Sequence, residues 1–395
     1  MTSLTKRLAP LFMTGALIAT PAYAQSGQEV FGDLKAALAA NGTTLTAGSV
    51  KDEGDGSFIA SDLKAAGDES ELTAKTLNVE GFQRADGGMN AERIVLEDLA
   101  GSFPDDVTMT LGSLSVDGFS LPGEGTTDLA KLVRYYSGYL VENLTIGLQG
   151  KTIVSVERGE SSAEYDETAQ IYSDQANWSG IVIDVEATPE GEGKTRLLEL
   201  GYSKINASLT AQSNYNAETG IVSISGMDLI VDDAFTLSTS LKLGGMTPEV
   251  LQVFSGAAAL DAQTSALNSQ EQQAELNRKQ LAALMQLSLV ELTYEIKDDS
   301  IVQKALDMQS KAMGMSADQL AASAPALVSM GMAQLNAPEF TASVAEAVGT
   351  FLKEQGTLSV SVKPENPAPF MQIAMTASLD PVSAIKNYNV VVEAK

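Results

Sequence analysis

The sequence predicts an α+β protein that is mainly β: an elongated antiparallel repetitive sheet, forming a groove or half-barrel, with a helical block in the C-terminal third. Two observations predict this class. A short sequence motif typical of a strand recurs along the first part of the chain. After Thr247, the spacing of apolar residues changes from the two-residue period of a strand to the period of about 3.6 residues of a helix. The predicted organisation is a signal peptide at 1–24, a β region at 25–246, a mainly helical block at 247–355 with one strand near 287–297, and closing strands at 356–395.

The recurring phrase is LNVEGF at 77–82 and LSVDGF at 114–119, with a third copy, VSISGM, at 222–227. Alternate side chains of a strand lie on one face, so each copy places two apolar side chains there before its Gly. A bulge at the Gly would insert one residue and return the next apolar side chain to the same face. We expect each copy to be one rung of a sheet that buries its apolar face by stacking on its neighbours. The side chains expected to line a groove or fill a core are Leu77, Val79, Phe82, Leu114, Val116, Phe119, Val222, Ile224 and Met227.

Turn signals separate strands throughout 42–245, and the clearest hairpin is predicted over 205–227. Helices are expected at 30–40 and 129–139 within this β region.

The helical block has its own start signals. Thr247 before Pro248 is typical of a helix N-terminus. Val290, Leu292, Tyr294 and Ile296 are predicted to share one face of the strand that follows. Three capping boxes then predict three helix starts: Ser300 with Gln303, Ser316 with Gln319, and Asn336 with Glu339. Closing strands are expected at 358–362, 371–375 and 390–392.

The N-terminus predicts export. Lys6 and Arg7 precede an apolar run, and small residues surround Tyr23, so we expect a secretory signal cut between Ala24 and Gln25. An uncleaved anchor is the alternative, but the run is shorter than the roughly 20 apolar residues that a span needs. The chain has no Cys, so neither a disulfide framework nor a lipidated cysteine is expected. The predicted location is the periplasm, with no transmembrane segment in the mature chain.

Charge and composition exclude several functions. The chain has 25 basic and 51 acidic residues, a net charge of −26, so nucleic acid and anionic lipid headgroups are unfavourable partners. His and Cys are both absent, which removes Ser-His-Asp and Cys-His catalysis and the zinc sites that use those ligands. We therefore expect no catalytic residues, no metal and no cofactor, and a protein that is not an enzyme. A carboxylate pair is the catalytic arrangement that the composition leaves open.

The recurrent LNVEGF phrasing, the segment LGYSKINASLTAQSNYNAETGIVSISGMDLIVDDAFTLSTSLKLGGM at 200–246 and the secretory start resemble the AsmA-like and YdgA-like envelope proteins of Gram-negative bacteria. The resemblance covers residues 42–245 and is one of pattern. It implies a long periplasmic β-groove, and some proteins of this kind are implicated in moving lipids between membranes. The absence of a retained N-terminal anchor and the largely helical C-terminal third are departures from that pattern.

Three functional hypotheses follow. The first is a non-catalytic periplasmic protein of the cell envelope that binds or moves a lipid-like apolar ligand along a β-groove. The second is a structural or assembly factor of the envelope, with a filled core and no ligand, whose partner is another envelope protein. The third is a carboxylate-dependent hydrolase. The first two differ in whether side chains such as Phe82 and Phe119 face an open space or a closed core.

Overall fold

The computed structural model describes residues 26–40, 42–67, 70–85, 88–121, 135–254 and 269–395. The predicted signal peptide at 1–24 and its cleavage site at Ala24 and Gln25 lie outside these residues, as does most of the helix predicted at 129–139. The predicted fold class is confirmed: the protein is mainly β, its strands pair antiparallel, and helices are concentrated in the C-terminal third. The chain divides into two compact units.

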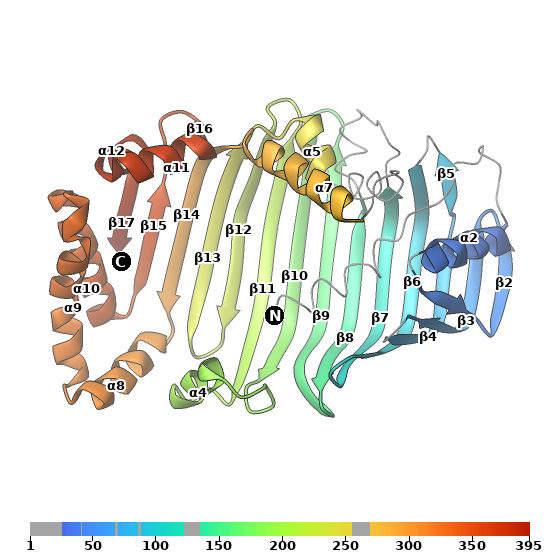
Figure 1. Cartoon of the computed structure of the whole chain (residues 1–395), viewed down its shortest axis with the longest axis horizontal. Helices are drawn as coiled ribbons and strands as arrows, with labels where there is room; N and C mark the ends of the chain where they lie inside the picture. The colour runs from blue at the N-terminus through green and yellow to red at the C-terminus, as the bar shows by residue number, and fades with distance from the viewer. Residues whose placement is uncertain (1–25, 41, 68–69, 86–87, 122–134, 255–268) are drawn as a thin grey trace. The chain divides into compact units, whose positions relative to one another are not determined.

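Unit 1 comprises the residues up to Thr168 together with Thr247–Leu284. Its helices are α2 (Gly27–Ala40), α5 (Pro248–Phe254) and α7 (Ser269–Leu284). Its strands are β1 (Thr44–Thr46), β2 (Ser49–Gly54), β3 (Ser57–Ala66), β4 (Glu71–Glu80), β5 (Gln83–Ala85), β6 (Gly88–Phe103), β7 (Val107–Leu121), β8 (Gly138–Leu148) and β9 (Lys151–Asp166), and Figure 1 labels β2 to β9.

The sheet of unit 1 is a meander in which β3, β4, β6, β7, β8 and β9 each pair with the next. Short strands complete it: β1 and β2 pair with successive parts of β3, and β5 extends the β4 side of β6. Consecutive hairpins of this kind need only local connections, which is why turn signals locate them well.

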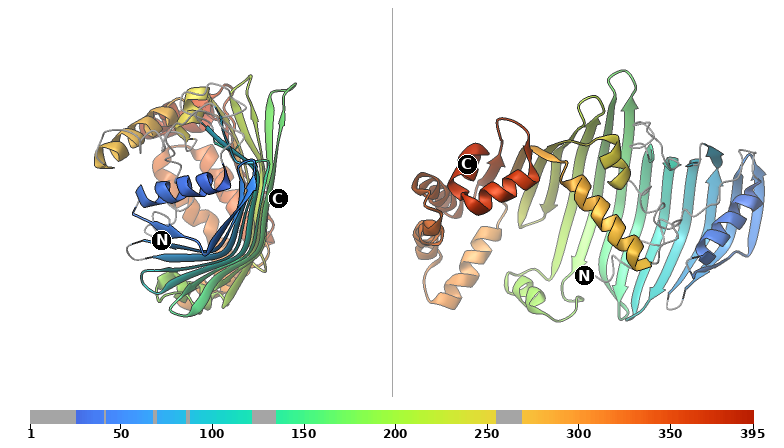
Figure 2. Two further views of the ribbon diagram at one scale, coloured as in Figure 1. Left: turned by 90° about the vertical axis from the view of Figure 1, so that its right-hand side faces the viewer. Right: turned by 45° about the horizontal axis from the view of Figure 1, so that its top comes forward.

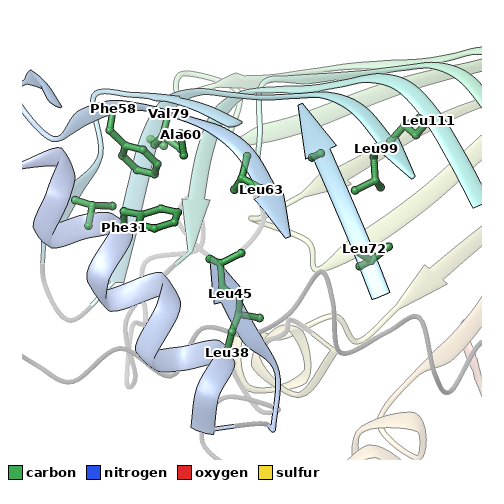
Figure 3. Close-up of a cluster of buried hydrophobic side chains, with 13 residues drawn as sticks. Phe31, Leu38, Leu45, Phe58, Ala60, Leu63, Leu72, Val79, Leu99 and Leu111 are labelled. Carbon is green, nitrogen blue, oxygen red and sulfur yellow. The ribbon is translucent and has the colours of Figure 1, made fainter. Parts of the chain in front are cut away.

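Helix α2 packs on the apolar face of the first strands, β1, β2 and β3, which curve around it in Figure 2. Ser26 and Glu29 form a reciprocal capping box at its start, with nitrogen-to-oxygen distances of 2.9 and 3.3 Å. Phe31 of α2 meets Phe58 of β3 edge to face, with ring centroids 5.8 Å apart, and Figure 3 shows both rings within the buried cluster. Phe58 is only 1% exposed, so unit 1 has a closed hydrophobic core.

Two rows of kinks cross the sheet of unit 1 from strand to strand. In each row, residues of neighbouring strands face one another, and the register is the same on both sides of the row. Positions in the two rows are six residues apart along a strand, as from 75 to 81, 98 to 92 and 112 to 118. The first kink row is Asp62, Lys75, Asp98, Gly112, Asn143 and Glu157, and the second kink row is Gly81, Glu92, Gly118 and Ser137.

At each kink row, the spacing of side chains on the core face changes from two residues to three, as between Val79 and Phe82. Each strand, followed from its N-terminal end, crosses one kink row and then the other. The backbone φ is positive at the later crossing, at Asp62, Gly81, Asp98, Gly118 and Asn143. Gly, Asn and Asp are the residues that tolerate this conformation best.

The bulges predicted at Gly81 and Gly118 are therefore partly wrong. The Phe that follows each Gly does return to the core side, but neither strand gains a residue relative to its neighbour. The neighbouring strand kinks at the same place, because Glu92 lies opposite both glycines. Gly226 differs, since it is an extra residue relative to the paired strand and so forms a true bulge.

Unit 2 comprises Ala169–Met246 and Met285–Lys395. Its strands are β10 (Ile171–Asp184), β11 (Lys204–Asn216), β12 (Ile221–Val231), β13 (Phe235–Gly244), β14 (Ser288–Asp298), β15 (Thr357–Val362), β16 (Ala368–Pro369) and β17 (Val390–Ala394). Its helices are α4 (Glu192–Glu199), α8 (Ile301–Met313), α9 (Ala317–Met332), the 3-10 turn η1 (Ala333–Leu335), α10 (Pro338–Glu354), α11 (Phe370–Leu379) and α12 (Pro381–Asn387).

The sheet of unit 2 runs in the order β10, β11, β12, β13, β14, β15 and β17, with β16 beside the start of β14. The predicted hairpin at 205–227 is confirmed as β11 and β12. Helix α10 packs on β17, where the Ser343 hydroxyl donates a hydrogen bond of 3.5 Å to the Val392 carbonyl. A covered edge strand is protected from pairing with another chain.

Two element predictions in this unit are wrong. The strand expected at 371–375 is helix α11, because Met, Gln and Ala favour a helix and the alternation of Met371, Ile373 and Met375 also fits one. Val290 does not share a face with Leu292. It is an extra residue between two paired positions, and Leu289 takes its place on that face.

Of the predicted caps, Ser316 forms its capping box with Gln319, as expected. Ser300 precedes α8, but its hydroxyl donates to the Asp233 carbonyl, and the Asp298 carboxylate accepts the Val302 N–H at 2.8 Å instead. Asn336 is one residue too early, since Ala337 precedes Pro338 at the start of α10.

Candidate functional site

One face of the unit 2 sheet carries a continuous apolar lattice. The register places six large side chains in a single row, each directly opposite the next across neighbouring strands. The row is Trp178, Leu209, Leu229, Leu237, Ile296 and Leu358. Directly opposed side chains on one face are close enough to touch, so the row is one strip of apolar surface.

Two further rows lie beside the first on the same face. The second row is Met227, Thr239, Tyr294 and Val360, and the third is Ile224, Leu241, Leu292 and Val362. The bulges at Gly226 and Val290 matter here, because each skips one residue and so keeps the apolar side chains of β12 and β14 in phase. We call the large apolar side chains of these three rows the open face: Trp178, Leu209, Ile224, Met227, Leu229, Leu237, Leu241, Leu292, Tyr294, Ile296, Leu358, Val360 and Val362.

Every residue of the open face is partly exposed. Met227 and Tyr294 are 36% and 45% exposed, and the others are half-buried. Burial is nearly complete at both ends of this face: Tyr215 and Leu289 are 4% and 5% exposed at one end, and Asp298 is 8% exposed at the other. A side chain such as Phe58 under α2 is closed off from solvent. The open face is therefore a sheet surface whose side chains pack against one another without a full cover.

The opposite face of the same strands is polar. Ser225, Ser238, Ser240, Thr293 and Ser359 alternate with the residues of the open face. Alternation of this kind is typical of a sheet with one solvated side.

Most charges of this region lie on the polar face. Asp174 and Asp298 are on the other side, at the ends of the rows: Asp174 lies opposite Ser213, which faces Ile224, and Asp298 lies opposite Phe235. Glu291 accepts hydrogen bonds from Lys363 at 3.2 Å and Lys242 at 3.3 Å, and these bonds hold its pKa below the usual value. The open face is thus apolar and free of charge at its centre, and it suits an apolar ligand.

The nine sequence-predicted site residues fall into two separate groups. In unit 1, Val79 belongs to the closed core under α2, and Leu77, Phe82, Leu114 and Phe119 pack against that core. Val116 lies opposite Ile94, which packs against the same core. Val222, Ile224 and Met227 lie in unit 2, on the side of β12 that carries the open face. The two copies in unit 1 thus pack at a hydrophobic core, and the third copy lies on the open-face side of unit 2.

Several open-face residues were missed by the sequence analysis, above all Trp178, Leu209 and Leu237. Their alternation is visible in the sequence, as in Leu237, Thr239 and Leu241, but nothing in one strand says which strands stand beside it. The signal that would have found them is the register of the predicted hairpin, since Leu209 and Leu229 pair within it.

The carboxyl groups with displaced pKa values give no support for acid catalysis. Hydrogen bonds from Thr247, Arg278 and Ser383 lower the pKa of Glu249, Glu275 and Asp380, respectively. A general acid needs the opposite displacement, because it must keep its proton near neutral pH. Among the residues that the structure describes, no group of three or more acidic side chains could hold a metal ion.

Within the described ranges, none of the helices combines the length and apolar character needed to cross a bilayer. A family model described as "Uncharacterized protein" matches residues 228–395, which include the last four residues of β12 and all of β13 to β17. No curated protein matches the chain.

Proposed function

We propose that this protein is a non-catalytic envelope protein that is exported to the periplasm and binds a lipid-like apolar ligand on the open face of unit 2. The observation that carries the proposal is the partial exposure of every residue in the open face. Apolar surface of this extent is unusual on a monomer without a binding role. Covering it with a hydrocarbon chain would remove that surface from water, and the gain is roughly 25 cal/mol per Å².

The dimensions of the open face suit an acyl chain. Its first row crosses six strands, so with about 4.8 Å between strands it is about 24 Å long. One acyl chain spans half of a bilayer core of about 30 Å, or about 15 Å. A single chain therefore fits along the row, and its ester or headgroup end can reach solvent.

Export and location in the periplasm are supported by the N-terminal sequence. The basic start, the apolar run and Ala22 and Ala24 are the features of a cleaved signal. The resemblance to AsmA-like envelope proteins, which rests on the sequence pattern alone, is consistent with the same proposal.

The second candidate, a structural or assembly factor, is favoured by unit 1. There the repeated Phe82 and Phe119 are partly buried and pack against the hydrophobic core, as expected of a structural part. Unit 1 would then serve as a scaffold even if unit 2 binds a ligand.

Trp178 provides a direct test, because it is the only Trp of the chain and lies in the first row of the open face. The probe is a monoacylglycerol that carries bromine on its acyl chain, since bromine quenches Trp fluorescence on contact. We expect saturable quenching of Trp178, and competition by the unbrominated compound.

A matched pair of variants locates the binding. Leu229 lies on the open face, and the next residue, Ile230, lies on the polar face of the same strand. Leu229→Glu should abolish quenching by burying a charge under the ligand, whereas Ile230→Glu should leave it intact. Circular dichroism checks that both variants fold, and Leu229→Gln serves if the charge prevents folding. Quenching that never saturates, or that both variants weaken equally, would rule the proposal out.

A further inference from the structure

Helix α11 presents an apolar stripe to solvent. Phe370, Met371, Met375 and Leu379 are 37%, 46%, 57% and 82% exposed, and the last three follow one another at intervals of four residues along one side of the helix. The ten residues of α11 include no Asp, Glu, Lys or Arg, although the whole chain carries a net charge of −26. This is an uncharged apolar surface on a strongly acidic protein.

The other side of α11 is fixed to the sheet. Ile373 packs with Ala384 and Tyr388 against Val362 and Val390. Val362 lies opposite Leu292 in the third row, so α11 sits at one end of the open face. Figure 1 shows α11 and α12 together where β16 leads into the helix pair. The stripe is thus held outward on a rigid base, next to the proposed ligand surface.

We propose that α11 docks on the surface of a lipid bilayer with neutral headgroups by inserting this stripe, so that the open face takes its ligand from that bilayer. The inference rests on the proposed function for the ligand, while the docking itself is measured separately.

Two observations favour a bilayer over a protein partner. The four side chains expose on the order of 400 Å², about half of the roughly 800 Å² that each partner buries in a stable protein complex. The stripe also has no charged or hydrogen-bonding groups that could fix the orientation of a protein partner, whereas insertion into hydrocarbon does not require such groups. Met side chains suit a fluid surface because they are flexible and polarizable. Asp380, directly after the stripe, and the negative net charge disfavour anionic headgroups.

The test is flotation of the full chain with vesicles of phosphatidylcholine and phosphatidylethanolamine. We expect the wild-type chain to float with the vesicles, equally at low and high salt, and less well when phosphatidylglycerol is added. Met375→Glu and Leu379→Glu should each reduce the bound fraction about tenfold or more. Met330→Glu is the matched control, because Met330 on α9 is 75% exposed but lies outside the stripe.

Three results would overturn the inference: a wild-type chain that does not float, equal loss in the Met330 and Met375 variants, or a dimer in sedimentation that Met375→Glu converts to monomer, which would assign the stripe to a second copy of the chain. Met375→Gln repeats the test without a charge if Met375→Glu fails to fold. Quenching of Trp178 by the soluble brominated monoacylglycerol should be unchanged in Met375→Glu, so failure of docking and failure of ligand binding are told apart.

Discussion

Adding one methyl group at Gly118 tests the second kink row. Gly118 has a φ of +60°, and a Cβ built there would lie 2.6 Å from the Ser137 hydroxyl oxygen and 3.1 Å from the Ser137 Cβ. Ser137 has little freedom to move, since its N–H donates to the Asp117 carbonyl and its own carbonyl accepts from the Ala163 N–H, both at 2.8 Å. Gly118→Ala should therefore cost the conformational term, about 1–2 kcal/mol, and an overpacking term of about 1–3 kcal/mol.

Gly150 separates the two terms. Its φ is +76°, but nothing lies within 4 Å of an added Cβ, so Gly150→Ala should cost only the conformational term. With an m-value of about 2 kcal/mol per molar urea, the unfolding midpoint of the Gly118 variant should fall about 0.5–1.5 M below that of the Gly150 variant. The assay is urea unfolding followed by far-UV circular dichroism, because Trp178 lies in unit 2 and does not report on unit 1. Equal midpoints for the two variants would refute the packing of the second kink row.

Three further predictions concern stability. Phe58→Ala should cost about 3–5 kcal/mol in urea unfolding, because it leaves a cavity in the closed core, and a loss below about 1 kcal/mol would contradict that core. Ser316→Ala should cost about 0.5–2 kcal/mol in the same assay through its capping box, so a neutral result would argue against the box. Glu291 has a lowered pKa, first from its hydrogen bond with Lys363 and then from that with Lys242. Its contribution is therefore present above the ordinary pKa of 4.5 and lost as the pH falls through the lower folded value. Glu291→Gln should make thermal unfolding less sensitive to acid below about pH 4.5, and an unchanged acid profile would contradict the predicted contribution.

The positions of strands and turns were predictable from the sequence, whereas the pairing of one strand with another was not. The hairpin of β11 and β12 follows from alternation and a turn signal. The Gly before each Phe indicated an irregularity at Gly81 and Gly118, although it is a kink with positive φ and not the predicted bulge. The matching kink at Glu92 could not be predicted from the sequence. Glu92 has an ordinary φ, and its place in the kink row depends on the residues of the neighbouring strands that lie opposite it.

The sequence also did not predict which faces of the sheet are covered by other elements. Leu77 and Leu229 occupy similar alternating patterns, yet the first packs against a closed core and the second belongs to an open face. The difference lies in what packs on each face: α2 packs on β1, β2 and β3 and contributes to the core that Leu77 adjoins. Contacts between different elements leave no trace in local periodicity. The error at 371–375 has a different origin, because in a stretch of six residues the alternation of a strand and the stripe of a helix select overlapping positions.

The kink rows of unit 1 restrict how such a sheet can change during evolution. A single-residue insertion between the rows would put one strand out of line with both neighbours, whereas added residues beyond the rows, near the turns, would leave the alignment intact. Positive φ alternates between the rows from one strand to the next, at Gly81 and Gly118 in one and at Asp62, Asp98 and Asn143 in the other. Adding two strands together would therefore preserve the alternation, whereas adding one strand would break it. LNVEGF and LSVDGF recur two strands apart along the sheet, on β4 and β7, as duplication of a whole hairpin would leave them.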